Sequence, residues 1–488
     1  MMNTLTIRAD CSSAIGTGHV MRMIALGQAW QDLGGKVQFV GETTPLHRRL
    51  RKEGFTIVPI SNVYPAPTDL KTLLDATSKN DWVAIDGYHF DTAYQQAMRA
   101  AGRKTLVVDD ICDREQYCAD ILLNQNPDAG QYTYPINDDA ICLLGSTYAL
   151  LRNEFIFPET QLTKPLHVKN VIVTLGGADV GNMTSTVINA LASLKNCSLH
   201  VKIVAGAANP NLPELKEKTQ ENRFELLYNP KDLAFHMRWA DLAVTASGST
   251  CWELCHIGIP MIAIETAANQ HGVQTELIKK KIAICFEQEV DEKTLATTIR
   301  SLVSDHALRS LMRRNGQRLI DGKGSERCAL SILRLSTSLR PVKNEDCRQL
   351  FDWRNDPIVR EKSFNPQPLI YCDHEKWFFN KIKDSNCLFF IAEAPSGQAL
   401  GQFRFDLKGN EALVSIIIAP TMHGKGLGTT ITKMACQRLG HFAPNATAVA
   451  MVKAENQSSA TMFKKAGFLL VPNNNSDDLR FEWKNTLC

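Results

Sequence analysis

The sequence predicts an α/β protein of three domains, and three features of the chain support this prediction. Short apolar strands alternate with helical segments from Leu5 to about Leu335, which is typical of βαβ units and parallel sheets. This alternation breaks between Phe155 and Val168, where two prolines and several polar residues intervene. Beyond Ser336 to Lys343 the pattern changes to helices with antiparallel strands. We therefore expect Rossmann-like domains at 1–158 and 159–337 and an α+β domain at 338–488.

Six strands are expected on each side of the break at 155–168. Before the break they are 5–10, 36–41, 81–87, 104–110, 119–124 and 140–145. After it they are 171–177, 199–206, 223–228, 242–247, 260–265 and 282–286. Two such halves would face each other across a cleft, which is the usual place for a nucleotide ligand. In the third domain we expect an amphipathic helix at 375–382 and strands at 388–394, 401–407 and 412–420.

The composition is that of a folded globular protein. Of its 488 residues 44% are hydrophobic and 22% charged, and the 29 glycines and 20 prolines are scattered, which excludes collagen-like and disordered classes. The formal net charge of +3 is too balanced for polyanion binding by bulk electrostatics. Nucleic acid is therefore not an expected partner.

The cysteines and the amino terminus bear on the compartment. Fourteen cysteines without regular spacing in a long chain favour a reducing cytosol over a disulfide framework. The amino terminus lacks an apolar core of signal-peptide length, and the chain contains no stretch of about 18 uninterrupted apolar residues. We expect a cytoplasmic protein without a membrane partner; the sequence does not specify its oligomeric state.

A glycine-rich turn follows the first predicted strand. Gly16 and Gly18 permit a tight turn into a helix, and the unpaired N–H groups at such a helix start suit polar or anionic ligands. His19 lies at the junction of turn and helix, where its imidazole would suit proton transfer near neutral pH. A plain structural turn and a capping or packed histidine are the alternatives.

Two further turns are candidates for phosphate binding in the second half. Gly176 and Gly177 end a strand where the backbone can approach a phosphate, although a plain turn has the same pattern. At 247–250 a Ser/Gly turn precedes a helix, so that the turn would bind a diphosphate and Glu253 a ribose. Thr250 and Glu253 also match a capping box, which needs no ligand. The cysteines nearby lack the spacing of a structural zinc site, and no metal is expected.

Five segments together resemble the UDP-2,4-diacetamido-2,4,6-trideoxy-β-L-altropyranose hydrolases of pseudaminic acid biosynthesis. They are 7–22, 143–155, 171–179, 245–260 and 265–270. The resemblance covers about the first 335 residues and implies a GT-B arrangement related to the glycosyltransferases that make lipid II. It also implies inverting hydrolysis at the anomeric carbon with release of UDP and without a metal. Cys11 stands where the family usually has alanine, which is a small change.

The resemblance implies that His19 activates the attacking water. The implied substrate contacts are Gly16, Thr17, Gly18, Arg22, Tyr88, Gly176, Gly177, Ser249, Thr250, Glu253, Asn269 and Gln270. UDP leaves readily once its charge is offset, so the enzyme mainly needs to place a water and take its proton. A pair of carboxylates flanking the bond is then not required. The strand-end carboxylates are possible helpers or N-caps: Asp10, Asp86, Asp109 and Asp110.

The third domain contains a second glycine-rich loop. Residues 423–428 place three glycines between an apolar strand and a helix, which forms a cradle of backbone N–H groups for a pyrophosphate. No G-K-[ST] closes the loop, which disfavours ATP. Together with 455–468 it resembles the GNAT acetyltransferases, with His423 where Gln or Arg is usual. The resemblance implies acetyl-CoA as cosubstrate, bound by Ile418, His423, Gly424, Lys425, Gly426, Gly428 and Asn456.

The acid and base of this domain are less evident from the sequence. The tyrosine that often serves as acid in the family is Phe463 here, which cannot donate a proton. Glu411 is a candidate base, and an exposed edge-strand carboxylate is the alternative. Segments 353–356 and 374–378 resemble the acceptor-side helices of amino-sugar and ribosomal-protein N-acetyltransferases, although such aromatic residues are more often core.

The fusion of the two resemblances suggests consecutive reactions. The resemblance implies that acetylation of a UDP-4-amino-sugar yields the substrate of the hydrolase, and fusing the two enzymes raises the local product concentration. We therefore expect a bifunctional enzyme that binds a UDP-sugar and acetyl-CoA. The alternatives are a GT-B glycosyltransferase fused to a protein N-terminal acetyltransferase, and a regulatory protein that binds UDP-sugars without turnover.

Overall fold

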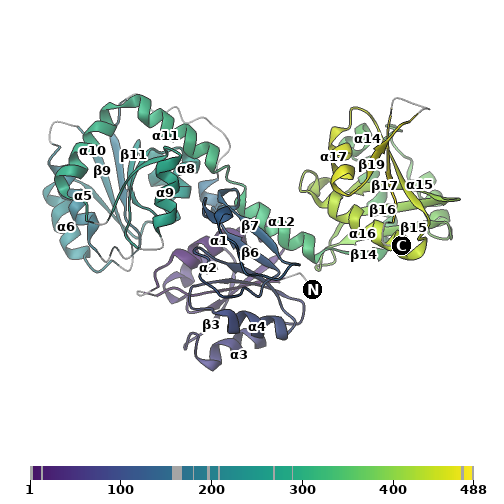
Figure 1. Ribbon diagram of the computed structural model, residues 1–488, viewed down its shortest axis with the longest axis horizontal. Helices are drawn as coiled ribbons and strands as arrows, with labels where there is room; N and C mark the ends of the chain where they lie inside the picture. Colours follow the sequence, from purple (N-terminus) through teal and green to yellow (C-terminus); the bar gives the residue numbers. More distant parts are fainter. Residues whose placement is uncertain are drawn as a thin grey trace. The chain divides into compact units, whose positions relative to one another are not determined.

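The computed structural model (Figure 1) consists of two compact units, from Thr4 to Ala329 and from Leu330 onward. The division falls within helix α12 (Gly324–Ser336), so residues 330–337 of the second predicted Rossmann-like domain belong to the second unit. The structure describes residues 4–12, 15–156, 167–177, 179, 181–194, 198–206, 209–267, 270–287, 289–473 and 478–485.

The first sheet is parallel throughout, and its described strands run in the order β3-β2-β1-β4-β5-β6-β7. The strands are β1 (Thr4–Ala9), β2 (Lys36–Gly41), β3 (Thr56–Pro59), β4 (Trp82–Asp86), β5 (Lys104–Val108), β6 (Ile121–Asn124) and β7 (Ile141–Leu144). The helices are α1 (Gly18–Asp32), α2 (His47–Lys52), α3 (Pro67–Asp75) and α4 (Thr92–Ala100). Six of these strands were predicted. The sequence prediction missed β3, a short, half-exposed edge strand that ends at a proline, which cannot donate to a ladder.

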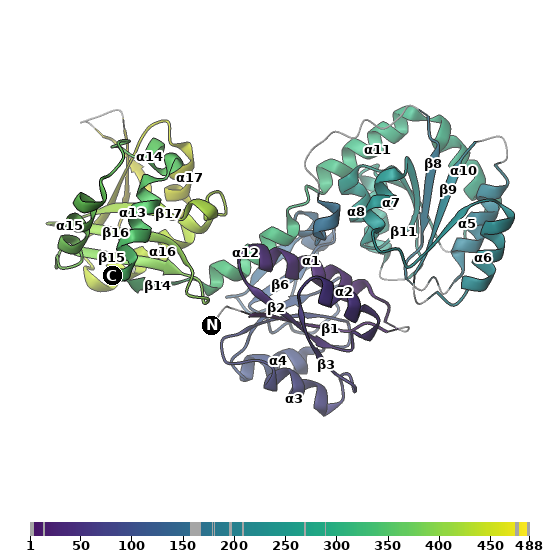
Figure 2. The ribbon, with the colours of Figure 1, turned by 180° about the vertical axis from the view of Figure 1, so that it is seen from behind.

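The second sheet is also parallel, with described strands in the order β10-β9-β8-β11-β12-β13 (Figure 2). The strands are β8 (Asn170–Thr174), β9 (His200–Ala205), β10 (Glu225–Tyr228), β11 (Leu242–Ala246), β12 (Met261–Ile264) and β13 (Ala283–Phe286). The helices are α5 (Met183–Ala192), α6 (Leu212–Glu221), α7 (Leu233–Trp239), α8 (Thr250–Ile257), α9 (His271–Lys279), α10 (Glu292–Ser304) and α11 (His306–Leu319). All six predicted strands are present.

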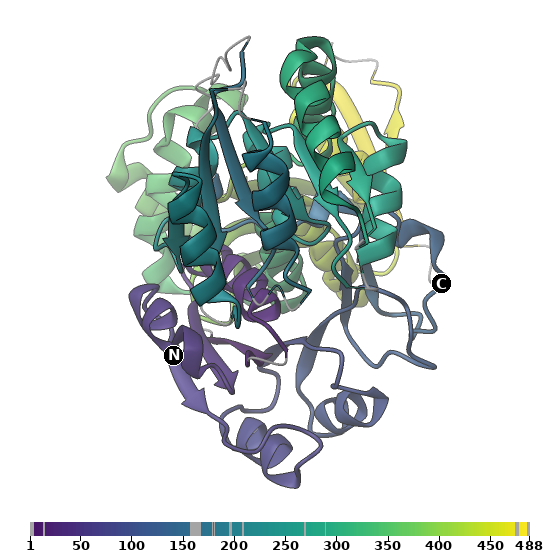
Figure 3. The same ribbon diagram turned by 90° about the vertical axis from the view of Figure 1, so that its left-hand side faces the viewer.

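Side chains of alternate strand residues pack into two separate cores on the two faces of this sheet. On one face Val171 and Val173 pack with residues of α5, α6 and α10, which lie nearest the viewer in Figure 3. On the other face Ile172 packs with residues of α7, α8 and α9, among them the fully buried Trp252. A parallel sheet covered on both faces buries nearly every strand residue, which explains its continuous apolar runs.

The third sheet follows the order β14-β15-β16-β17-β18-β20-β19 among the described residues. Its pairs are antiparallel except β17 with β18. The strands are β14 (Ser338–Pro341), β15 (Cys387–Glu393), β16 (Ala399–Lys408), β17 (Glu411–Ile418), β18 (Thr447–Val452), β19 (Leu469–Val471) and β20 (Leu479–Trp483). The helices are α13 (Cys347–Asn355), α14 (Pro357–Lys362), α15 (Tyr371–Lys381), α16 (Leu427–Phe442) and α17 (Gln457–Lys465). The predicted α/β class with a C-terminal α+β domain is confirmed.

The single parallel pair shapes this domain. β17 and β18 pair from Glu411 to Leu413 of β17, and no register pair joins them from Val414 to Ile418. Beyond Leu413 the described part of the sheet is therefore open between the two strands, which exposes backbone groups of β17 to a ligand. Across the parts of the chain that are described, no helix is both long and apolar enough to cross a membrane.

Candidate functional site

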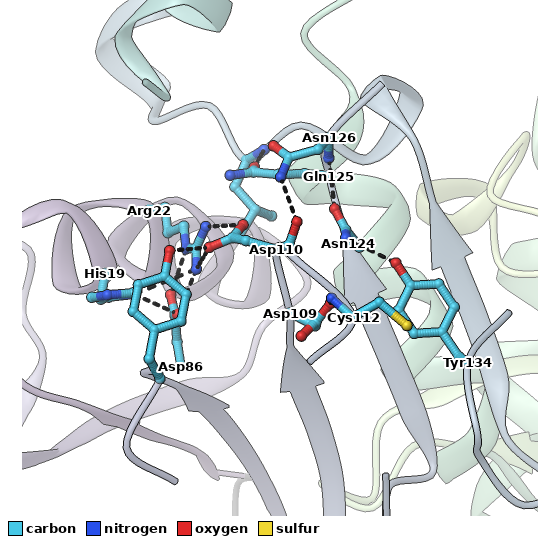
Figure 4. A network of polar contacts seen from close by, with 12 residues as sticks. His19, Arg22, Asp86, Asp109, Asp110, Cys112, Asn124, Gln125, Asn126 and Tyr134 are labelled. Carbon is cyan, nitrogen blue, oxygen red and sulfur yellow. Dashed lines mark hydrogen bonds and ion pairs between the residues drawn. The ribbon is translucent and has the colours of Figure 1, made fainter. Parts of the chain in front are cut away.

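The first site lies where β1, β4 and β5 end. β4 neighbours both β1 and β5, so the residues that follow these three parallel strands meet at one edge of the sheet. β4 ends on Asp86, Asp110 follows β5, and α1 begins nearby at Gly18. Figure 4 shows His19 and Arg22 of α1 converging on these two carboxylates.

His19 is held at one ring nitrogen and open at the other. Its Nδ1 lies 2.7 Å from Oδ1 of Asp86, whose side chain is fully buried. Although burial opposes it, Arg22 and His19 hold the pKa of Asp86 well below its ordinary value. An anionic carboxylate only accepts hydrogen bonds, so Nδ1 donates and the lone pair of the neutral ring lies on Nε2. Nε2 makes no hydrogen bond to the residues that the structure describes.

Arg22 fixes this pair from behind. Its Nε and Nη2 donate to the two oxygens of Asp86 at 2.6 and 2.7 Å, and its Nη1 and Nη2 donate to Asp110 at 2.8 and 2.9 Å. Tyr88 donates its hydroxyl to Asp110 at 2.8 Å and packs its ring edgewise on His19, 5.0 Å between centroids. Arg22 was expected to contact substrate; its guanidinium contacts these two carboxylates, and a contact with substrate stays a prediction. Arg22 orients Asp86, and Tyr88 orients the imidazole.

The glycine turn leaves open space beside His19. Gly16 has φ +80°, which favours glycine, and its N–H donates to the carbonyl of Ser12 at 2.8 Å. A Cβ added at Gly16 or Gly18 would have no atom of the described residues within 4 Å. Thr17 is the N-cap of α1 and makes no side-chain capping bond. Neither packing nor capping occupies the space at this helix start.

Asp10 and His89 form a second His–Asp pair at the end of β1. His89 Nε2 lies 2.9 Å from Oδ2 of Asp10, while Oδ1 of Asp10 accepts from buried Arg8 at 2.6 Å and from the N–H of Glu42 at 2.8 Å. Asp10 thus has a structural network of its own. The sequence analysis named Asp10 as a helper but did not anticipate His89.

A close backbone contact marks the strand-end glycines of the second sheet. Gly176 has φ +92°, and the carbonyl of Gly177 lies where a Cβ of Gly206 would stand. Gly206 follows β9, next to β8 in the sheet, so only glycine fits between these two turns. Gly206 is the last residue of the predicted strand 199–206, and its contact with Gly177 was not predicted.

The turn at 247–250 has no capping box. Ser249 is the N-cap of α8 and makes no side-chain capping bond, so the predicted alternative for Thr250 and Glu253 does not form. Glu253 instead accepts from Arg152 Nη2 at 2.7 Å, a partner that the sequence analysis missed. Burial raises the pKa of Glu253 against the opposing effect of Arg152.

Gln270 lies near this turn. Its Oε1 accepts from the N–H of Thr266 at 2.9 Å, and its Nε2 lies 3.8 Å from the Cβ position of Gly248. Ser247 Oγ is buried without a hydrogen-bond partner in the described chain. Donors and an unpaired hydroxyl therefore gather at the start of α8. Asn269, predicted to reach the ligand, lies outside the described residues.

The third domain contains a cavity of about 1030 Å³ that begins at the open side of β17. Of the predicted cofactor residues, those lining it are Ile418, His423, Gly424, Gly426, Gly428 and Asn456. His423 Nε2 donates to the carbonyl of Ile418 at 2.9 Å, and Asn456 caps α17 by accepting from Ser459 N–H at 3.1 Å. Lys425 is not among the lining residues; its carbonyl accepts from Arg334 at 2.6 Å.

Glu411 does not reach this cavity. Its exposed carboxylate accepts from Arg480 Nη2 at 2.7 Å, and it is not among the lining residues. Its carboxylate is exposed, as in the predicted alternative, but β17 lies between β16 and β18 and is not an edge strand. Phe463 lines the cavity and packs on Phe468 and Phe481.

Two residues that line the cavity, Gln402 and His374, carry buried hydrogen-bond acceptors. Gln402 Oε1 and His374 Nδ1 have no hydrogen-bond partner among the described residues. His374 Nε2 contacts the carbonyl of Cys347 at 3.2 Å and must donate to it, which leaves Nδ1 as an acceptor. Burial also lowers the pKa of His374 and so keeps the ring neutral.

The charges around the cavity are mainly positive. Among the described lining residues the acid is Asp373, and the bases are Arg354, Lys362, Arg404, Lys453 and Lys465. Arg404 lies over the ring of Trp377 at 4.9 Å. Both predicted acceptor-side segments thus contribute lining residues, although Trp353 and Phe378 are core. This balance favours anionic ligands.

No group of three or more potential metal ligands gathers anywhere in the described parts of the chain.

Comparison with known proteins defines the class. Residues 170–323 match the glycosyltransferase family 28 C-terminal domain, and residues 337–469 match the acetyltransferase (GNAT) domain. The chain therefore contains a segment similar to the glycosyltransferase family 28 C-terminal domain, followed by a segment similar to the GNAT domain.

Individual similar proteins are more informative than the two domain matches. A UDP-2,4-diacetamido-2,4,6-trideoxy-β-L-altropyranose hydrolase of Campylobacter jejuni is 26% identical over 281 residues, 56% of this chain and 95% of the relative. An uncharacterized Methanocaldococcus jannaschii protein, MJ1062, is 20% identical over 489 residues, 95% of this chain and 96% of the relative. MurG of Acinetobacter baumannii covers 68% of this chain and 99% of its own at 16% identity, with a TM-score of 0.46. The sequence resemblance is confirmed: part of the chain is similar to hydrolases of the pseudaminic acid pathway, and another part matches the GNAT domain.

Proposed function

We propose that this chain is a bifunctional enzyme of pseudaminic acid biosynthesis. Its first unit hydrolyses UDP-2,4-diacetamido-2,4,6-trideoxy-β-L-altropyranose to UDP and free sugar, with inversion at the anomeric carbon. Its C-terminal domain acetylates the 4-amine of the UDP-amino-sugar precursor with acetyl-CoA. The observation that carries the hydrolase half is the open Nε2 of His19, whose Nδ1 is held by anionic Asp86.

In the proposed hydrolysis His19 Nε2 takes a proton from water as the oxygen attacks the anomeric carbon. The bond from that carbon to the UDP oxygen breaks, and the electron pair leaves with UDP. Asp86 stabilises the imidazolium that forms, while Arg22 keeps Asp86 anionic. A positioned general base contributes about 10²- to 10⁴-fold to the rate.

The start of α8 is the proposed diphosphate site. Ser249 and Thr250 make no cap there, and the first N–H groups of α8 suit an anion. Ser247 Oγ and Gln270 Nε2 add donors beside the turn. Glu253 is the proposed ribose contact, since Arg152 occupies only one of its oxygens.

In the proposed acetyl transfer the amine of the acceptor attacks the thioester carbon of acetyl-CoA. A C–N bond forms, the C–S bond breaks, and the amine proton and the thiolate yield CoA. The left-handed Gly424 and Gly426 and the start of α16 form the pyrophosphate cradle. Gln402 Oε1 and His374 Nδ1 are the acceptors proposed for the amine hydrogens.

The surplus of positive charge around the cavity supports a nucleotide sugar as acceptor. A polyamine or a protein amino terminus would add like charge to this wall. A UDP-amino-sugar brings a diphosphate, and its acetylated product is the proposed substrate of the first unit.

A second candidate for the first unit is glycosyl transfer. The match of residues 170–323 to the glycosyltransferase family 28 C-terminal domain favours it. A transferase would release UDP only with a sugar acceptor present, whereas the proposed hydrolase needs none.

The test follows the diacetamido nucleotide sugar with the full-length protein by NMR. We expect UDP and a free sugar whose first-formed anomer is inverted. His19→Ala should lower UDP release at least about 100-fold and leave CoA release from acetyl-CoA and the amino-sugar intact. His306→Ala, at an exposed histidine of α11, is the matched control. No UDP from the wild-type protein would rule out the hydrolase half, and full hydrolysis by His19→Ala would place the base elsewhere.

A further inference from the structure

The loop of the third domain needs a support that its own sequence does not provide. Lys425 lies between two glycines with φ +75° and +73°, Gly424 and Gly426. Glycine populates positive and negative φ about equally, so the peptide between Lys425 and Gly426 can adopt opposite orientations at little cost. A cradle made of N–H groups functions only if these groups point to the phosphate.

Arg334 of α12 contacts this peptide directly. Its Nη2 donates to the carbonyl of Lys425 at 2.6 Å, and the same nitrogen would lie 2.5 Å from a Cβ at Gly426. The guanidinium therefore packs on the glycine itself, and a side chain at Gly426 would displace it. Both residues belong to the same compact unit.

The contact determines which way the N–H of Gly426 points. The carbonyl of Lys425 and the N–H of Gly426 belong to one trans peptide and point in opposite directions. With the carbonyl bonded to Arg334, this N–H points away from Arg334. It makes no hydrogen bond to any described residue and borders the cavity together with the first N–H groups of α16.

We propose that Arg334 is a positioning residue of the acetyl-CoA site, which orients the Lys425–Gly426 peptide so that its N–H faces the pyrophosphate. The proposal rests on the proposed acetyl-CoA binding of this domain. Arg334 lies before the matched GNAT domain, residues 337–469, so the cofactor site extends into the helix that follows the hydrolase-like segment. Its positive charge also stabilises the diphosphate from behind the loop.

The test measures CoA binding by calorimetry in the full-length protein, without any acceptor. Arg334→Met should weaken CoA binding about tenfold, which corresponds to about 1.4 kcal/mol for one charge-assisted hydrogen bond. Arg334→Lys, which keeps a charge and a donor, should recover part of the affinity. With acetyl-CoA and amine, Arg334→Met should raise the KM for acetyl-CoA, change kcat little and leave UDP release unchanged.

The matched control is Arg438→Met, at an exposed arginine on α16. CoA binding by Arg334→Met equal to that of the wild type would overturn the proposal. If wild-type protein binds no CoA, it is the proposed acetyl-CoA function that fails. If Arg334→Met does not fold, CoA binding is measured for Arg334→Gln and Arg334→Lys instead. CoA affinities equal to wild type in both variants would contradict the role of Arg334, whereas a larger loss of affinity in Arg334→Gln than in Arg334→Lys would support it.

Discussion

Replacing Asp86 by asparagine tests the hydrolase site most sharply. The amide keeps the size of the carboxylate but removes the negative charge 2.7 Å from His19 Nδ1. At an effective dielectric of about 20, opposite charges about 4 Å apart attract by about 4 kcal/mol. The remaining amide dipole and the release of Arg22 reduce the loss, so we expect about 2 to 4 kcal/mol. This corresponds to a kcat for UDP release about 30- to 1,000-fold lower.

The assay is UDP release from the diacetamido nucleotide sugar at saturating concentration, with CoA release as an internal control. The loss should appear in kcat more than in KM, because the imidazolium exists only as the water is deprotonated. Asp75→Asn, at an exposed aspartate of α3, is the matched control. A kcat of Asp86→Asn within twofold of wild type, with an unchanged melting temperature, would refute the role of Asp86.

Three further predictions concern stability and specificity. Gly206→Ala places a methyl group on the backbone of Gly177 and should lower unfolding stability by about 1 to 3 kcal/mol in thermal melts, whereas Gly130→Ala, with open space, should not. Arg354→Met removes Nη1, a buried nitrogen of a cavity-lining residue that has no hydrogen-bond partner in the described chain. The KM for the UDP-amino-sugar should rise about tenfold while the KM for acetyl-CoA stays constant. Equal effects on the two KM values would contradict a contact between Arg354 and the UDP-amino-sugar. The pKa of Asp86 is lowered in the folded state, so its charge stabilises the fold fully above the ordinary aspartate pKa of about 4, and this contribution is lost as the pH falls toward the lowered pKa. In thermal melts at decreasing pH, Asp86→Asn should therefore lose less stability than wild type.

The sequence predicted the parallel sheets because their buried strands are continuous apolar runs bounded by turns. It missed β3 and β14, which are short edge strands with few buried residues. It also missed β18, whose alternating alanine and valine residues lie between two helices. Edge strands carry little pattern, because only one neighbour and part of one face constrain them.

The site shows a similar limit. His19 could be found locally, because it follows a glycine turn at a helix start. Its pairing with Asp86, 67 residues away, depends on β4 lying beside β1 while β2 and β3 lie on the other side. Likewise, Arg152 and Arg334 act on segments far along the chain, Glu253 and the Lys425 carbonyl. Strand order and such long-range partners are properties of the tertiary structure, which local sequence patterns do not reveal.

Hydrolysis in ¹⁸O-labelled water tests the role of His19 most directly. With wild-type protein, mass spectrometry should find one labelled oxygen in the free sugar and none in UDP, and NMR should find the inverted anomer first. His19→Ala should form both products at least about 100-fold more slowly than wild type. Label in UDP, or a retained anomer, would contradict attack of a water on the anomeric carbon by way of His19.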